Sequence, residues 1–119
     1  MGENAIQRTI DAYFGAFANR DAEAFVACFA EDGALEQPIG RPQYRGHSAI
    51  RAYVTPVMAR FASLEMVPDF TVINTSSAAI SWRGRGVPRD GQPFAVFGVE
   101  VMDFTAEGKI ALCRAFTSG

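Results

Sequence analysis

The sequence has almost none of the residues that build metal centres and disulfide frameworks. Its 119 residues include two cysteines, Cys28 and Cys113, and one histidine, His47. The cysteines are far apart in the chain, and their separation matches no metal-binding spacing. We therefore expect no metal site and two reduced thiols.

The chain also lacks long apolar runs and a strong excess of charge. No stretch approaches the roughly 20 apolar residues that a membrane-spanning helix needs. The opening segment MGENAIQRTI has an early acid and no long apolar run, unlike a signal peptide. The net charge of −2 argues against nucleic acid or an anionic membrane as the main partner. We expect a soluble, cytoplasmic protein.

The sequence does contain enough apolar material for a packed core. Hydrophobic residues make up 49% of the chain, and ten residues are phenylalanine. The length fits one domain, residues 1–119. No internal repeat, linker or low-complexity segment divides it.

The first half of the chain has the apolar spacing of helices. A buried face of a first helix is predicted from Ile6, Ile10, Tyr13, Phe14 and Phe17. Asp21 is predicted to cap a second helix that ends at residues 31–33. The inward residues of that helix are Phe25, Val26 and Phe29. A short strand over residues 34–37 and a loop over residues 38–46 follow. A third helix begins near His47, and its apolar stripe includes Val54 and extends to Phe61, with Pro56 inside it.

After Pro68 the pattern changes to the alternation of strands. The predicted strands cover residues 70–73, 79–89, 94–104 and 109–117. Glycines inside them (Gly84, Gly86 and Gly98) predict bends or bulges. Trp82, which lies among arginines, is interpreted as part of a solvated strand face or of a rim around a dimer contact. Together the elements predict an α+β fold in which a curved, cone-shaped antiparallel sheet wraps around three N-terminal helices.

The strand over residues 94–104 is apolar on both faces. One face carries Phe94, Val96, Gly98, Glu100, Met102 and Phe104. The other carries Ala95, Phe97, Val99, Val101 and Asp103. We expect both faces to be covered, one by the helices and the other by a second copy of the chain in a homodimer.

Glu100 is the unusual residue of that strand, because burying an ionised carboxylate without a partner is costly. In its neutral form it is a hydrogen-bond donor for an oxygen on which negative charge develops. In its ionised form it is a candidate general base. The plain alternative is a structural acid satisfied by Arg114 or Tyr13. Tyr13 has the same two interpretations, either a site residue or a core tyrosine.

Three parts of the chain carry a resemblance to a known family. They are YFGAFANRDAEAFVACFAEDGALEQPIG, GHSAI and GQPFAVFGVEVMDFTAEGKI. From about Ile10 to Thr117 the chain resembles the bacterial ketosteroid isomerases and the wider SnoaL-like and nuclear transport factor 2-like superfamily. The resemblance implies a deep apolar pocket, a small hydrophobic ligand of steroid or polyketide type, and a dimer.

The resemblance also implies roles for individual residues. Tyr13 matches the tyrosine of the family's oxyanion hole, and Glu100 matches its neutral acid with one more methylene. Gln37 stands where the family has its aspartate base, but an amide has no proton affinity near neutral pH. The neighbouring Glu36 is predicted to point to the opposite face of the strand. The remaining predicted pocket residues are Phe17, Phe29, Val54, Val96, Gly98, Cys113 and Thr117.

Three hypotheses follow from these residues. The first is an enzyme that transfers a proton on a hydrophobic carbonyl compound without metal or organic cofactor, with ionised Glu100 as the base. The second is a protein that binds such a compound through Tyr13, Gln37 and Glu100 without converting it. The third is an assembly module whose cavity is incidental.

Overall fold

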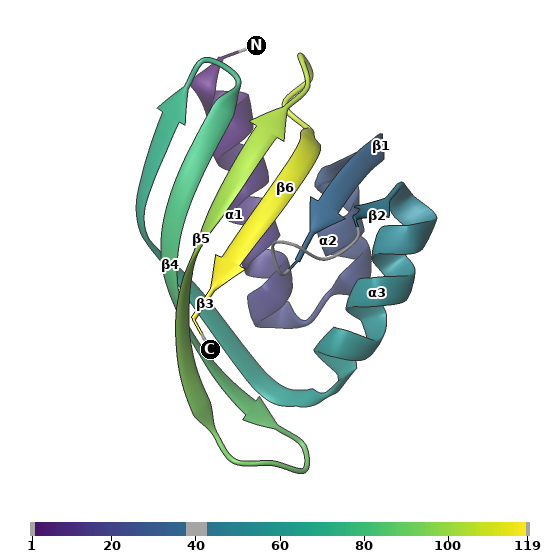
Figure 1. Cartoon of the computed structure of the whole chain (residues 1–119), viewed down its shortest axis with the longest axis vertical. Helices are drawn as coiled ribbons and strands as arrows, with labels where there is room; N and C mark the ends of the chain where they lie inside the picture. The colour runs from purple at the N-terminus through teal and green to yellow at the C-terminus, as the bar shows by residue number, and fades with distance from the viewer. Residues whose placement is uncertain (1, 38–42, 119) are drawn as a thin grey trace.

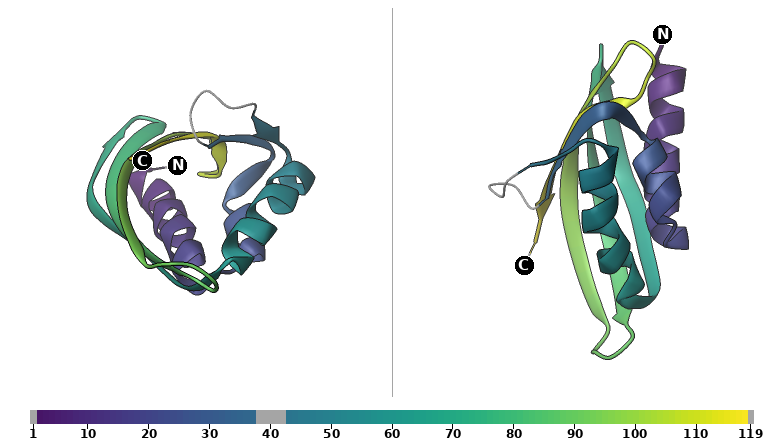
Figure 2. Two further views of the ribbon diagram at one scale, coloured as in Figure 1. Left: turned by 60° about the horizontal axis from the view of Figure 1, so that its bottom comes forward. Right: turned by 90° about the vertical axis from the view of Figure 1, so that its right-hand side faces the viewer.

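The computed structural model describes residues 2–37 and 43–118. The first half of the chain contains three helices, α1 (Glu3–Asn19), α2 (Ala22–Ala27) and α3 (His47–Ala59), with two strands between α2 and α3. They pack against one curved sheet, and the end view of Figure 2 shows the sheet as an arc with α1 inside it. No helix in the described ranges is long and apolar enough to cross a membrane.

The sheet has six strands in the order β2-β1-β6-β5-β4-β3 (Figure 1). Their bounds are β1 (Phe29–Glu36), β2 (Tyr44–Arg45), β3 (Phe61–Asn74), β4 (Ser77–Pro88), β5 (Phe94–Phe104) and β6 (Ile110–Thr117). All neighbours are antiparallel except β1 and β6, which run parallel. The predicted α+β class with a curved sheet and N-terminal helices is therefore confirmed.

The buried side of α1 is the predicted stripe. Its five residues, Ile6, Ile10, Tyr13, Phe14 and Phe17, are all buried in the core. The predicted cap of α2 is also present, because the Asp21 carboxylate accepts a hydrogen bond from the Ala24 N–H at 3.0 Å. Periodicity thus predicted the buried face of α1, and the capping signal predicted the start of α2.

The end of α2 was predicted too late. The helix stops at Ala27, and β1 already begins at Phe29 instead of at residue 34. Phe29 pairs with Ile110 of β6, and the Ile110 N–H donates to the Cys28 carbonyl at 2.9 Å. A partner from the far end of the chain, invisible in the local pattern, extends the strand.

The starts of β2 and β3 also differ from the predictions. Tyr44 and Arg45, expected in a loop, pair with β1, while residues 38–42 of that loop lie outside the described ranges. β3 starts at Phe61, which was assigned to the third helix, and passes through Pro68. Proline is tolerated there because β3 is an edge strand, and its register shifts between Pro68 and Phe70.

The strand glycines do not mark bulges. The pairing of β4 with β5 runs without a shift from Ser77 to Gly86, so Gly84, Gly86 and Gly98 lie in regular ladder positions. A Cβ atom at Gly86 or Gly98 would instead collide with aromatic rings of neighbouring strands, and one at Gly84 would lie 3.1 Å from the Trp82 ring of the same strand. The glycines therefore make room for rings, and the register shifts lie elsewhere in the sheet.

Candidate active site

Tyr13 from α1 and Glu100 from β5 meet inside the fold. The Tyr13 hydroxyl donates to Glu100 Oε1 at 2.6 Å, and the two residues are 0% and 1% exposed. Arg114, the other partner considered for Glu100, instead lies with its Nε 3.7 Å from Glu36 Oε1. The buried stripe of α1 and the inner face of β5, which were predicted separately, thus place the Tyr13 phenol against the Glu100 carboxyl group.

Two further side chains complete the surroundings of the carboxyl group. The Trp82 indole N–H donates to Glu100 Oε2 at 3.1 Å. The Cys113 sulfur lies 3.4 Å from Glu100 Oε1 and 3.7 Å from the Tyr13 hydroxyl oxygen. We call Tyr13, Trp82, Glu100 and Cys113 the carboxyl cluster.

Trp82 was missed as a site residue, and its assignment to a solvated strand face was wrong. It is 4% exposed and shares the inner face of β4 with Ala78 and Ile80. The signal was present in the sequence, because alternation from Ile80 places Trp82 on the apolar side. The adjacent arginines, Arg83 and Arg85, do point outward and are exposed.

Gly98 explains how an indole fits against the sheet. It pairs with Trp82 across the β4–β5 ladder. A Cβ atom at Gly98 would lie 2.6 Å from Trp82 Cζ2 and 2.3 Å from the Phe116 carbonyl oxygen. Without a side chain there, the indole lies across β5 and its N–H reaches Glu100, two residues along the strand.

Burial dominates the electrostatics of the cluster. It raises the pKa of Glu100 to about 7 from an ordinary value of 4.5, although the hydrogen bonds from Tyr13, Cys113 and Trp82 work in the opposite direction. Burial also raises the pKa of Tyr13 and the pKa of Cys113 well above their ordinary values, and the nearby Glu100 adds to both shifts. Near neutral pH the carboxyl group therefore exists in both forms while the phenol and the thiol keep their protons.

The predicted wall residues divide into two groups. Phe17, Phe29 and Val54 are buried in the core around Tyr13, and Val96 packs against that core from a half-buried position. The Tyr13 and Phe17 rings lie 5.4 Å apart in an edge-to-face arrangement. Thr117, in contrast, is exposed near the end of β6 and does not share this interior.

Gln37 directly follows the last residue of β1 and is half-buried. Within the described part of the chain it makes no hydrogen bond to Tyr13 or Glu100. Its neighbour Glu36 is also half-buried and lies near Arg114 and Gln43. The structure therefore joins three predicted residues, Tyr13, Glu100 and Cys113, and leaves Gln37 outside their hydrogen-bond network.

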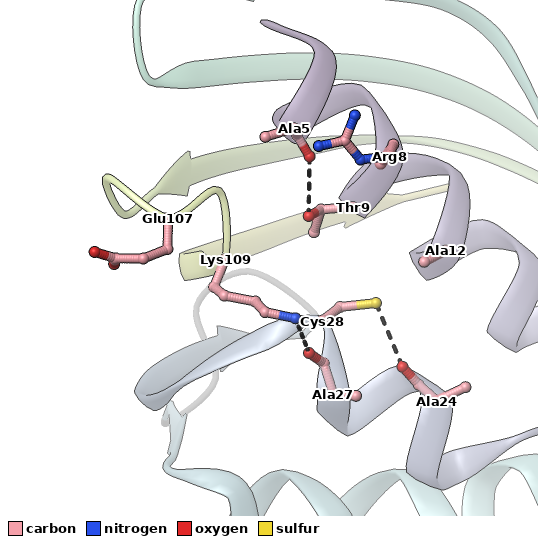
Figure 3. A pocket seen from close by; sticks show the side chains of 9 residues that line it. All are labelled: Ala5, Arg8, Thr9, Ala12, Ala24, Ala27, Cys28, Glu107 and Lys109. Atoms are coloured by element: carbon pink, nitrogen blue, oxygen red, sulfur yellow. Dashed lines mark hydrogen bonds between the residues drawn. The ribbon is translucent and has the colours of Figure 1, made fainter. Parts of the chain in front are cut away.

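Two surface pockets lie away from the carboxyl cluster. One of about 330 Å³ is formed by α1, α2 and the turn before β6 (Figure 3). It is lined by Ala5, Arg8, Thr9, Ala12, Ala24, Ala27, Cys28, Glu107 and Lys109. The other, of about 420 Å³, is lined by Ile6, Thr75, Ser76, Phe104, Thr105 and Ala106. Neither of these two pockets includes a residue of the cluster.

No group of three histidine, cysteine or acidic side chains in the described ranges is arranged to hold a metal ion. The chemistry available to the cluster itself is proton donation and acceptance. Glu100 supplies a titrating carboxyl group, Tyr13 a hydroxyl that both donates and accepts, and Trp82 an N–H that only donates.

Comparison with known proteins agrees with this architecture. A sequence profile described as a SnoaL-like domain matches residues 10–113. A steroid Delta-isomerase of Nocardioides simplex is 31% identical over 111 residues, which cover 93% of this chain and 88% of that protein.

Solved structures show the same fold at low sequence identity. SalBIII, described as an epoxide hydrolase/cyclase-like enzyme in pyran ring formation in the polyether salinomycin, has a TM-score of 0.85 at 22% identity, covering 98% of this chain and 92% of that one. An NTF2-like protein of unknown function from Burkholderia pseudomallei has a TM-score of 0.84 at 19% identity, with coverages of 99% and 92%. An LEH-like epoxide hydrolase of M. tuberculosis has a TM-score of 0.81 at 15% identity, with coverages of 97% and 84%.

Proposed function

The chain belongs to the SnoaL-like domain family, and from this premise we propose that it is a ketosteroid-isomerase-like enzyme. Its reaction is proton transfer on a small hydrophobic carbonyl compound, of isomerase, cyclase or dehydratase type, without a cofactor. The observation that carries the proposal is the 2.6 Å hydrogen bond between Tyr13 and Glu100 in a fully buried setting.

The ligand's oxygen binds at Tyr13. Removal of a proton from a carbon next to a carbonyl group places negative charge on the carbonyl oxygen. A buried phenol stabilises that charge far better than water does, because few other dipoles compete in a dry interior. The phenol keeps its proton for this task, since burial holds the pKa of Tyr13 well above its ordinary value.

Glu100 is the proton carrier. It is the one buried charged residue in the described ranges, and Gln37 cannot take this role. A base works best when its pKa lies near the pH of the reaction, which the value of about 7 satisfies. As Glu100 takes up the proton it becomes a weaker acceptor, so the Tyr13 O–H turns toward the ligand oxygen when that oxygen gains charge.

The steroid name of the relative suggests the first substrate to test, a β,γ-unsaturated 3-ketosteroid. Conversion to the conjugated ketone is followed by ultraviolet absorbance, and exchange of the α-carbon proton is followed in deuterated water. We expect exchange with the natural chain, a loss of about 100- to 1,000-fold in Tyr13→Phe, and loss of exchange in Glu100→Gln. Folding of each variant is checked by circular dichroism.

The variant Gln37→Asp separates the remaining outcomes. Activity in this variant alone would mean that the interior accepts the steroid while the natural reaction is a different one. Binding of the steroid without exchange would favour a non-catalytic binding protein. Absence of both binding and exchange in the natural chain and in Gln37→Asp would contradict a steroid-like substrate.

A second candidate function is a dimeric assembly module of the same fold. It is favoured by the burial of the carboxyl cluster, which lines neither of the two pockets described above, together with the exposed apolar residues on the outer side of the sheet. A chain that dimerises but binds no hydrophobic carbonyl compound would support it.

A further inference from the structure

Trp82 makes one carboxyl oxygen of Glu100, Oε2, a hydrogen-bond acceptor. Its N–H lies 3.1 Å from Oε2, and an indole N–H donates but never accepts. Trp82 is the chain's one tryptophan and is 4% exposed. The ring packs directly against the backbone at Gly98, its partner in the ladder.

The other oxygen, Oε1, has a hydroxyl partner that can either donate or accept a hydrogen bond. The Tyr13 hydroxyl at 2.6 Å either donates to Oε1 or accepts from it. The Cys113 thiol at 3.4 Å from Oε1 is a weak donor that also lies near the Tyr13 oxygen. A proton on Oε2 would meet the indole N–H, whereas a proton on Oε1 has the Tyr13 oxygen as an acceptor.

We propose that Trp82 is a positioning residue that keeps Oε2 of Glu100 as a permanent acceptor and thereby makes Oε1 the oxygen that gains and loses the proton. When Glu100 is ionised, Tyr13 donates to Oε1. When Glu100 is neutral, the Oε1–H group donates to the Tyr13 oxygen, and the Tyr13 O–H is released toward a ligand oxygen. Protonation of Glu100 thus reverses the direction of the Tyr13–Glu100 hydrogen bond. It also frees the Tyr13 O–H to donate to a ligand.

Among the groups that face Glu100, Glu100 itself is the one that changes its charge around pH 7. Tyr13 approaches from α1 and Cys113 from β6, and Tyr53 of α3 couples to Glu100 electrostatically over a longer distance. Burial raises the pKa of each of these three groups, so all remain neutral around pH 7. No cationic side chain in the described ranges contacts Glu100.

The consequence for specificity rests on the proposed function, because it takes Tyr13 as the ligand-facing group. At lower pH the site prefers a ligand with an acceptor oxygen, such as a ketone. At higher pH it prefers a ligand that donates, such as an enol or a phenol. The positioning role of Trp82 itself requires no ligand and is tested without one.

The experiment follows the Glu100 carboxyl carbon by NMR in protein labelled with ¹³C at glutamate Cδ, and Glu100→Gln identifies the signal. In Trp82→Phe we expect the titration midpoint to rise by about 1 to 2 pH units, because the ionised form loses a charge-assisted hydrogen bond. The matched control is Tyr53→Phe, which removes a nearby phenol that makes no hydrogen bond in the described structure. Its midpoint should stay close to that of the natural chain.

A second measurement follows the natural chain and so does not depend on the folding of Trp82→Phe. The single indole N–H resonance should shift downfield with the same midpoint as the Glu100 carbon, and Glu100→Gln should abolish that shift. An indole signal that ignores the Glu100 titration, or a folded Trp82→Phe protein with an unchanged midpoint, would overturn the proposal. Neither result depends on steroid turnover, so a failed isomerase assay and a failed titration are distinguishable.

Discussion

The two faces of β5 reverse the usual sorting of side chains. On the concave face Glu100 is 1% exposed, whereas on the convex face Phe97 is 66% exposed and Val99 is 39% exposed. Soluble domains seldom bury an acid or leave large apolar groups together in water. These two placements are the reason that we propose a ligand for the concave face and a partner for the convex face.

The convex face presents several exposed apolar side chains on β3, β5 and β6. We call its exposed apolar residues the convex patch: Val67, Phe70, Val72, Phe97, Val99 and Phe116. They lie on adjacent strands, since Phe70 pairs with Ser81, Ser81 with Val99, and Val99 with Phe116. We propose that a second copy of the chain covers this patch, which would make the outer face a protein interface and the inner face a ligand site.

The largest expected effect is on that interface. Replacing two rings of the convex patch, Phe70→Ser and Phe97→Ser together, should weaken dimerisation by about 4 kcal/mol, or roughly a thousand-fold, because exposed aromatic anchors dominate such contacts. Sedimentation equilibrium over a range of concentrations measures the change. The control is Val87→Ser, an exposed apolar position near the β4–β5 turn and outside the patch. A natural chain that is monomeric at high concentration would refute the dimer.

The next largest effect concerns the concave face. Because the pKa of Glu100 is raised from 4.5 to about 7, the folded state binds its proton more tightly than the unfolded state does. The free energy of unfolding should therefore fall as the pH rises from about 4.5 to about 7 and then level off. The loss is about 3 kcal/mol for a shift of this size.

Chemical denaturation at several pH values measures this slope, and Glu100→Gln should remove it. The matched control is Glu65→Gln, which removes a carboxylate from the outward side of β3 and leaves the interior untouched. A slope that survives in Glu100→Gln would mean that another group carries the pH dependence and that Glu100 is not the buried acid in solution.

Much of the difference between the concave and convex faces of β5 could be predicted from periodicity. A period of 3.6 placed Tyr13 on the inner stripe of α1, and a period of two placed Glu100 opposite Phe97 and Val99. The bounds of β5 match the prediction at both ends. These features depend on neighbours within a few positions, which is the range that a sequence pattern describes.

The remaining features depend on partners that are distant in the chain. β1 starts early because Phe29 pairs with Ile110, and β3 starts early because Phe61 pairs with Pro88. Alternation from Ile80 already places Trp82 on the inner face of β4, but its contact with Glu100 depends on Gly98 opposite it and on the position of the acid two residues farther along β5. No local spacing reveals which residue of another strand will lie opposite.

The smallest expected effect tests how the concave face is held together. Tyr13→Phe removes the hydroxyl that donates to Glu100 while keeping the ring among Phe17 and Phe25. Below pH 6 the loss should be about 1 kcal/mol of unfolding free energy, the usual value for a bond between neutral groups. Above pH 8 it should grow to about 2 kcal/mol, because the ionised carboxylate loses a stronger donor. Tyr53→Phe, whose ring stacks on Tyr44, serves as the control and should show no such difference between the two pH values. An equal loss from Tyr13→Phe at both would mean that the hydroxyl acts on packing alone and does not sense the charge of Glu100.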